Sequence, residues 1–99
     1  MLNNPLIDAL QHWYLENCNG EWEHSQGIKI ETLDNPGWSI HIDLNGTRIE
    51  GKVIDWRLDE RSENDWVGHK ADGQTLRIDC GPGNLAEALT IFHNLVNYP

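Results

Sequence analysis

The amino-acid sequence predicts an α+β domain in which a five-stranded antiparallel meander sheet carries an N-terminal and a C-terminal helix on one face. Apolar residues recur at spacings of three and four near both ends of the chain, which is the period of a helix with one buried stripe. Between these ends apolar and polar residues alternate, and turn sequences separate the alternating runs. One apolar sheet face and two apolar helix stripes pack most simply as two layers.

The first helix is expected within residues 3–18. Asn4 can cap its start, and Pro5 suits the first helical position because that position needs no backbone donor. The stripe that this helix buries consists of Leu6, Leu10, Trp13 and Tyr14. We therefore expect Trp13 to lie in the core.

Five strands are expected in the middle of the chain. They cover residues 28–33, 38–44, a segment that begins at Thr47, residues 65–71 and residues 74–80. Asn45-Gly46 is the strongest short signal for a two-residue hairpin, and Asp72-Gly73 predicts a second hairpin of this kind. Each strand should then pair with the next one along the chain.

Charges on the outward sides of the strands agree with these hairpins. In the Asn-Gly hairpin Asp43 would oppose Arg48, and His41 would face Glu50. In the first hairpin Lys29 would oppose Asp43. Extending the third strand in the same register turns its apolar residues from Ile54 onward away from the core.

The last helix is expected after the Gly-Pro-Gly segment. Asn84 is placed to cap it, and Glu87 lies three residues further on, as in a capping box. The buried stripe of this helix consists of Leu85, Leu89, Phe92 and Val96.

Composition narrows the classes of function. Ninety-nine residues suit one domain, residues 1–99, and the net charge of −9 opposes binding to nucleic acid or to anionic membranes. No apolar run approaches the roughly 20 residues that cross a bilayer, and the N-terminus has no signal-peptide pattern, so we expect a cytoplasmic protein. Cys18 and Cys80 are too few for a zinc site or a disulfide framework, and they read as small buried thiols.

The segment CNGEWEHSQG, residues 18–27, concentrates residue types that are common in sites. Glu21, Glu23 and His24 are the candidates for a metal-dependent hydrolase, but nothing downstream completes a ligand set. No nucleophile signature is present, and the Gly-Pro-Gly segment lacks the lysine of a phosphate loop. We expect no catalytic residue, metal or cofactor, and keep a small-ligand-binding module as an alternative.

Five tryptophans in one domain are unusual, and two of them fall on outward positions. The predicted registers turn Trp56 and Trp66 toward solvent, together with Ile54. An acidic segment adds Asp59, Glu60, Glu63 and Asp65. An aromatic centre with an acidic rim is typical of a surface that binds a basic protein. The alternative is a bulge near Ile54 that returns these side chains to the core.

Residues 13–38, WYLENCNGEWEHSQGIKIETLDNPGW, resemble the signature of the Immunity protein 53 family. The residues that carry the resemblance are Trp13, Tyr14, Cys18, Gly20, Trp22, Glu23, His24, Gly27, Thr32, Leu33, Asp34, Asn35, Pro36, Gly37 and Trp38. The resemblance implies a cytoplasmic, non-enzymatic antidote to a toxin of a bacterial polymorphic or contact-dependent competition system. Such a protein would bind its cognate toxin stoichiometrically and block the active site.

The acidic charge of the chain suggests that the toxin is a basic, nuclease-type domain. In the loop after the first helix, Trp22 is expected to anchor the loop, while Glu23 and His24 either brace it or face the partner. The predicted partner-binding residues are Trp22, Glu23, His24, Trp56, Asp59, Glu60, Glu63, Asp65 and Trp66.

Overall fold

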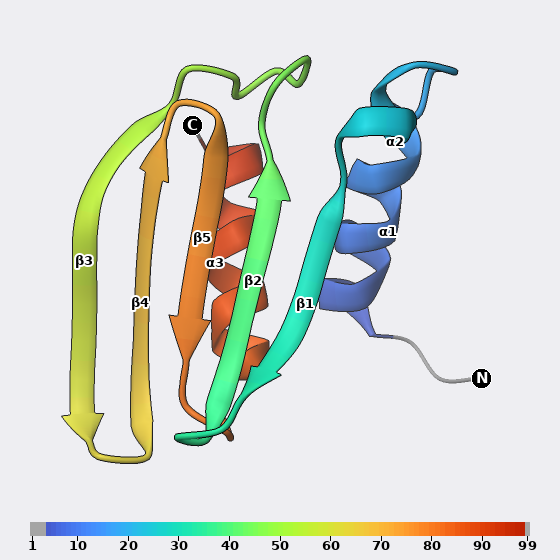
Figure 1. Ribbon diagram of the computed structural model, residues 1–99. Coiled ribbons are helices and arrows are strands. Elements are labelled where there is room, and N and C mark those ends of the chain that lie inside the picture. Colours follow the sequence, from blue (N-terminus) through green and yellow to red (C-terminus); the bar gives the residue numbers. More distant parts are fainter. Residues whose placement is uncertain (1–3, 99) are drawn as a thin grey trace.

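The computed structural model describes residues 4–98 and contains three helices and five strands (Figure 1). In chain order the elements are α1 (Pro5–Asn17), α2 (Trp22–Ser25), β1 (Ile28–Leu33), β2 (Gly37–Asp43), β3 (Val53–Ser62), β4 (Asp65–Asp72), β5 (Thr75–Cys80) and α3 (Leu85–Asn97). The predicted α+β class is confirmed, and each predicted helix and strand has a counterpart in the structure.

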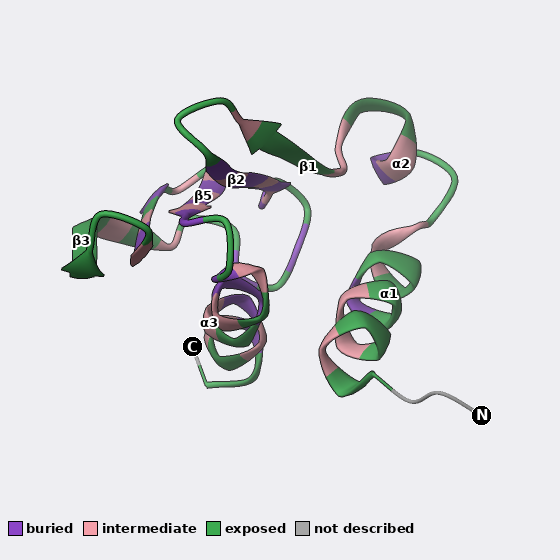
Figure 2. Cartoon of the chain, turned by 90° about the horizontal axis from the view of Figure 1, so that it is seen from below, coloured by how far each residue is buried: buried purple, intermediate pink, exposed green. Residues whose placement is uncertain are grey.

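The five strands form one antiparallel sheet in the order β1-β2-β5-β4-β3. Viewed along the strands, α1 and α3 lie on the same side of the sheet, with α3 beneath the central strands and α1 beneath the β1 side (Figure 2). The two helices also contact each other. Within residues 4–98 no helix covers the other side of the sheet, and we call this side the open face.

The predicted meander is wrong in its second connection, because β2 pairs with β5 rather than with β3. The chain leaves β2 at Leu44 and reaches β3 at the far edge of the sheet through residues 44–52. Asn45-Gly46 lies in a turn closed by the Thr47 amide, which donates to the Leu44 carbonyl at 3.0 Å. Leu44 and Ile49 are buried, so this connection contributes apolar side chains to the core instead of pairing as a strand.

The charge pairs that the Asn-Gly hairpin predicted are therefore absent. Arg48 does not oppose Asp43 but lies 3.8 Å from Glu16 on α1. His41 opposes Arg77 across β2 and β5.

The first hairpin forms with a register two residues away from the predicted one. Lys29 lies opposite His41 rather than Asp43, because the pairing continues to Leu33 and Gly37 and leaves a shorter turn. A shift of two residues keeps each side chain on its own face, so the apolar faces still meet.

The hairpin between β4 and β5 also forms, but its turn falls at Gly73-Gln74, one residue later than the predicted Asp72-Gly73. Ala71 opposes Leu76, and the carboxylate of Asp72 accepts the amides of Gln74 and Thr75 at 2.9 and 2.8 Å. An aspartate commonly closes a turn by accepting amides two or three residues further along the chain, and Gly73 supplies the positive φ of 93° that this turn uses.

The helix starts differ in how they are capped. Asn4 caps α1 as predicted, since its side-chain oxygen accepts the Ile7 amide at 3.2 Å. The capping box predicted for α3 does not form. The Asn84 side chain instead bonds to Asp65, Glu87 and the Trp66 amide.

Trp13 lies at the centre of the core, between the two long helices. Its side chain is 2% exposed, and its ring meets Trp22 and Phe92 edge to face at centroid distances of 5.9 and 5.3 Å. Trp38 also lies on the helix side of the sheet, but it is only half-buried, and its ring nitrogen donates to the Pro82 carbonyl at 3.1 Å. Trp38 therefore lies on the inner face of the sheet and packs against the core, but it is less buried than Trp13.

Candidate functional site

The structure divides the predicted partner-binding residues between opposite edges of the sheet. Trp22, Glu23 and His24 form the short helix α2 beside β1, whereas the other six lie on β3, on β4 and in the turn between them (Figure 1). The two groups do not form one continuous surface.

The residues of α2 act mainly within the fold. Trp22 is 6% exposed, and its ring nitrogen donates to the Asn45 carbonyl at 2.8 Å. The carboxylate of Glu23 accepts the amides of Asn19 and Gly20 at 2.9 and 2.8 Å, which braces the loop ahead of α2. Backbone hydrogen bonds, from its own amide and then from Asn19 and Gly20, lower the pKa of Glu23. His24 is exposed.

The candidate metal ligands Glu21, Glu23 and His24 do not form a metal-binding group in the described part of the chain. Within residues 4–98 no group of three or more histidine, cysteine, aspartate or glutamate side chains is placed to hold a metal ion. Burial raises the pKa of the Cys80 thiol to about 11, so this thiol is protonated at neutral pH and is a poor nucleophile.

A bulge in β3 decides which of its side chains reach solvent. The pairing of β3 with β4 shifts between Ile54 and Arg57, the kind of irregularity that the alternative prediction placed there. Ile54 pairs with Ala71 and packs against the core, so the expectation that Ile54 faces outward is wrong. Trp56 sits inside the bulge and stays on the open face, where it is 47% exposed.

Trp56 belongs to an apolar stripe along the edge strand. Val53 and Leu58 are 67% and 51% exposed and occupy the same face of β3. We call Val53, Trp56 and Leu58 the β3 stripe. Trp66, half-buried, lies on the corresponding face of β4. Large apolar side chains gathered at a free sheet edge are typical of a protein-binding surface.

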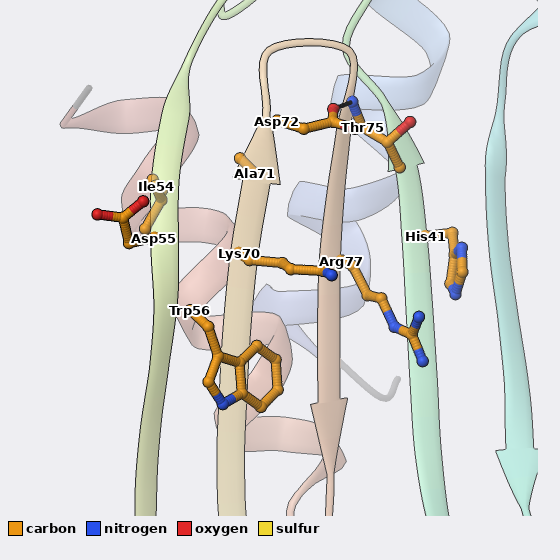
Figure 3. Close-up of a pocket in the computed structure, with 9 residues that line it drawn as sticks. All are labelled: His41, Ile54, Asp55, Trp56, Lys70, Ala71, Asp72, Thr75 and Arg77. Atoms are coloured by element: carbon orange, nitrogen blue, oxygen red, sulfur yellow. Dashed lines mark hydrogen bonds between the residues drawn. The ribbon is translucent and has the colours of Figure 1, made fainter.

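The ring of Trp56 rests on the backbone of Gly68. A Cβ atom at position 68 would lie 2.4 Å from two carbons of the Trp56 ring, so the ring can occupy this place only above a glycine. Figure 3 shows the ring lying across β4 on the open face. The ring is thus held in one place while half of it remains available to a partner.

Arg61 gathers three carboxylates at the end of the sheet. Its guanidinium lies 2.9 Å from Asp59, 2.7 Å from Asp65 and 2.6 Å from Glu87 of α3. Two of the predicted partner-binding residues, Asp59 and Asp65, are therefore paired with Arg61 within the hairpin, and Arg61 ties this hairpin to α3 through Glu87. Glu60 and Glu63 are exposed, and neither forms a salt bridge within the described part of the chain.

This cluster makes stability depend on pH. Hydrogen bonds from Arg61 lower the pKa of Asp65 and of Glu87 below their ordinary values. A carboxylate whose pKa is lowered by folding stabilises the fold above its unfolded-state pKa, and this stabilisation is lost as the pH falls through the folded-state pKa.

We expect Arg61→Gln to lower the thermal midpoint at pH 7 and to lower it progressively less as the pH falls from about 4 toward 2, because protonation of the carboxylates in the folded state removes the charges that Arg61 pairs with. The midpoint, followed by circular dichroism across this range, provides the test. The control is Arg48→Gln, which removes an exposed arginine whose nearest carboxylate is 3.8 Å away. Equal losses at pH 7 and pH 3 would show that the cluster is not what Arg61 stabilises.

Sequence analysis missed a group of basic side chains beside Trp56. Lys70, Arg77 and His41 line a hollow of about 330 Å³ on the open face, and Trp56 forms one of its sides (Figure 3). Their proximity follows from the pairing of β5 with both β2 and β4. The sequence placed all three side chains at outward positions, but the predicted meander kept β2 apart from β5 and so separated His41 from Arg77 and Lys70.

A comparison with known protein families gives a match over nearly the whole chain. The model of the Immunity protein 53 family matches residues 7–97, which extends the resemblance seen over residues 13–38 to both helices and all five strands. No curated protein and no solved structure gave a significant match. No helix within residues 4–98 is long and apolar enough to cross a membrane. Members of an immunity family inhibit a toxin and are not enzymes. The chain belongs to the Immunity protein 53 family.

Proposed function

We propose that this protein neutralises its cognate toxin by forming a stoichiometric complex that blocks the toxin's active site, and that the contact surface is centred on the β3 stripe. The observation that carries this proposal is the placement of Trp56. Its ring is held above Gly68 and is nearly half exposed on the open face. Binding hot spots are enriched in tryptophan that is already ordered before the partner arrives.

The surroundings of the stripe suit a toxin with a basic surface. Glu60 and Glu63 are exposed beside the stripe, and the chain as a whole carries −9. A nuclease-type toxin presents basic groups to its substrate, so an acidic rim could cover that cleft and speed the encounter. The complex would act in the cytoplasm of a bacterium that carries a polymorphic or contact-dependent toxin system, with residues 1–99 as the single binding domain.

The α2 region contributes less to this proposal. His24 is exposed and remains a candidate contact, while Trp22 and Glu23 would support the partner only indirectly through the loop that they hold.

Coexpression with the toxin domain encoded beside this chain's gene tests the proposal. We expect restored growth and a soluble complex that contains one copy of each chain, whereas unrelated toxins should give neither. Growth that recovers without a physical complex would contradict stoichiometric inhibition, and a complex that leaves the toxin fully active would contradict blockage of its active site.

We also expect the association rate to fall as salt rises, because exposed charges separated by more than about 8 Å are screened at physiological ionic strength. The dissociation rate should change much less, since the β3 stripe is apolar. Surface plasmon resonance with the inactivated toxin over a series of salt concentrations measures both rates. An association rate that does not change with salt would show that the acidic rim does not speed the encounter with the toxin.

A further inference from the structure

Four basic side chains stand in one row across the open face. Lys29 on β1 opposes His41 on β2, His41 opposes Arg77 on β5, and Arg77 opposes Lys70 on β4. We call these four residues the basic row. The whole chain contains only seven lysines and arginines against sixteen acidic residues, so three of the seven share a single row.

The row has a cost for the fold. Like charges directly opposite each other on neighbouring strands destabilise a sheet, and here Lys70 faces Arg77 in that way. Within the protein the compensation is partial. The Nε of Arg77 donates a hydrogen bond to Asp79 at 3.1 Å, and the Nζ of Lys29 lies 3.8 Å from a carboxylate oxygen of Glu31. Among residues 4–98 Lys70 forms no salt bridge, and the two terminal nitrogens of Arg77 have no hydrogen-bond acceptor.

A short hydrogen-bond chain orients the rest of the row. Ser39 donates its hydroxyl proton to Asp79 at 2.6 Å, so its oxygen is left to accept from the Nε2 of His41 at 3.1 Å. Asp79 therefore holds both Ser39 and Arg77, and through Ser39 it fixes the ring of His41.

The hollow beside the row has donors on one side and an aromatic wall on the other. Lys70 and Arg77 extend across the sheet toward His41, while the ring of Trp56 closes the opposite side (Figure 3). Two carboxylates also border the hollow, but Asp72 accepts two backbone amides of its own turn, and Asp55 points away from the hollow. The unpaired polar groups of the hollow are therefore donors, and they can bind a hydrogen-bond acceptor.

We propose that the basic row receives an acidic segment of the toxin, with an aspartate or glutamate side chain between Lys70 and Arg77 and its neighbour against Trp56. This inference rests on the proposed function and adds to it that the toxin's contact surface includes carboxylates as well as basic groups. A carboxylate suits the paired donors of a guanidinium, and the small hollow suits one side chain. A nucleic-acid backbone would meet the acidic rim and the net charge of −9.

Two matched variants test the proposal, Lys70→Gln in the row and Arg48→Gln on the helix side, each of which makes the net charge more negative by one. With the inactivated toxin domain encoded beside this chain's gene, Lys70→Gln should weaken binding about 10-fold and Arg48→Gln less than about 2-fold. Lys70→Glu should weaken toxin binding further. Replacing one acidic residue of the toxin with lysine should restore the affinity for the Lys70→Glu variant, but not for the wild-type protein or for Lys70→Gln. If the wild-type protein binds the toxin and both Lys70 variants bind it equally well, this inference is wrong and the proposed function still holds.

A complex that fails to form with the wild-type protein would instead overturn the proposed function. A short poly-glutamate peptide, with poly-lysine of equal length as comparison, then tests the row without the toxin. Backbone NMR shifts at His41, Lys70 and Arg77 with poly-glutamate only would support an acceptor site for carboxylates. Equal shifts with both peptides, or none with either, would overturn it.

Discussion

Replacing Trp56 with alanine should weaken toxin binding by about 2 kcal/mol or more, roughly 30-fold in Kd, while changing the free energy of unfolding by about 1 kcal/mol or less. The binding loss is expected because an ordered aromatic ring at the centre of an interface excludes water and contributes a large apolar area. The stability loss is small because nearly half of the ring is already in water. Titration calorimetry and urea unfolding of the same preparations measure the two quantities.

Tyr98→Ala is the matched control, since Tyr98 is a 78% exposed aromatic residue beyond the end of α3. Its removal should leave the affinity unchanged. If Trp56→Ala binds the toxin as well as the wild-type protein does, the contact surface is not centred on the β3 stripe.

Gly68→Ala tests the placement of the ring without removing it. The new methyl group would fall 2.4 Å from the ring, so Trp56 must leave its place above β4. We expect weaker binding than wild type and no further loss when Gly68→Ala is added to Trp56→Ala. Additive losses in the double variant would mean that residue 68 contacts the toxin independently of Trp56.

Replacing Trp13 with alanine should cost about 3 to 5 kcal/mol of stability, a large part of the 5 to 15 kcal/mol that holds a typical domain folded. Trp13 is buried between Trp22 and Phe92, so truncation leaves a cavity that three elements would have to fill. Within residues 4–98 its ring nitrogen has no hydrogen-bond partner, and the loss is therefore one of packing rather than of hydrogen bonding.

Trp13→Phe keeps most of the buried area and removes the unpartnered donor, so it should destabilise the domain by less than half as much as Trp13→Ala. Urea unfolding of both variants gives the comparison. A loss below about 1 kcal/mol for Trp13→Ala would contradict its place at the centre of the core. Binding measurements on these variants have meaning only where the protein is still folded.

Local sequence patterns predicted the helices and strands well, but they did not predict which strands pair when these lie far apart in the chain. The spacing of Leu6, Leu10 and Trp13 marks α1, and alternation marks the strands, because both signals are carried by neighbouring residues. The order of the strands depends on the pairing of β2 with β5, and β5 begins more than thirty residues after β2 ends. Asn45-Gly46 gave a strong local hairpin signal, but burial of Leu44 and Ile49 outweighed it.

The candidate site was predicted in part for the same reason. Trp56 is exposed as expected, although a bulge rather than simple alternation places it there and returns Ile54 to the core. The acidic residues were visible in the sequence, but their pairing was not: Arg61 binds Asp59 and Asp65 within the β3–β4 hairpin and Glu87 on α3. The basic row could not be joined without the correct strand order, since Lys29 and His41 on one side meet Arg77 and Lys70 on the other only through the pairing of β2 with β5.

Hydrogen exchange of the complex tests the central claim most directly, because it locates the covered face without any substitution. Amides of β3 and of the neighbouring part of β4 should exchange more slowly in the complex than in the free protein, with β3 showing the largest change because it is an edge strand of the sheet. The exposed sides of α1 and α3 should exchange as they do in the free protein. Protection confined to the two helices, with β3 unchanged, would contradict the claim that the toxin is bound on the open face.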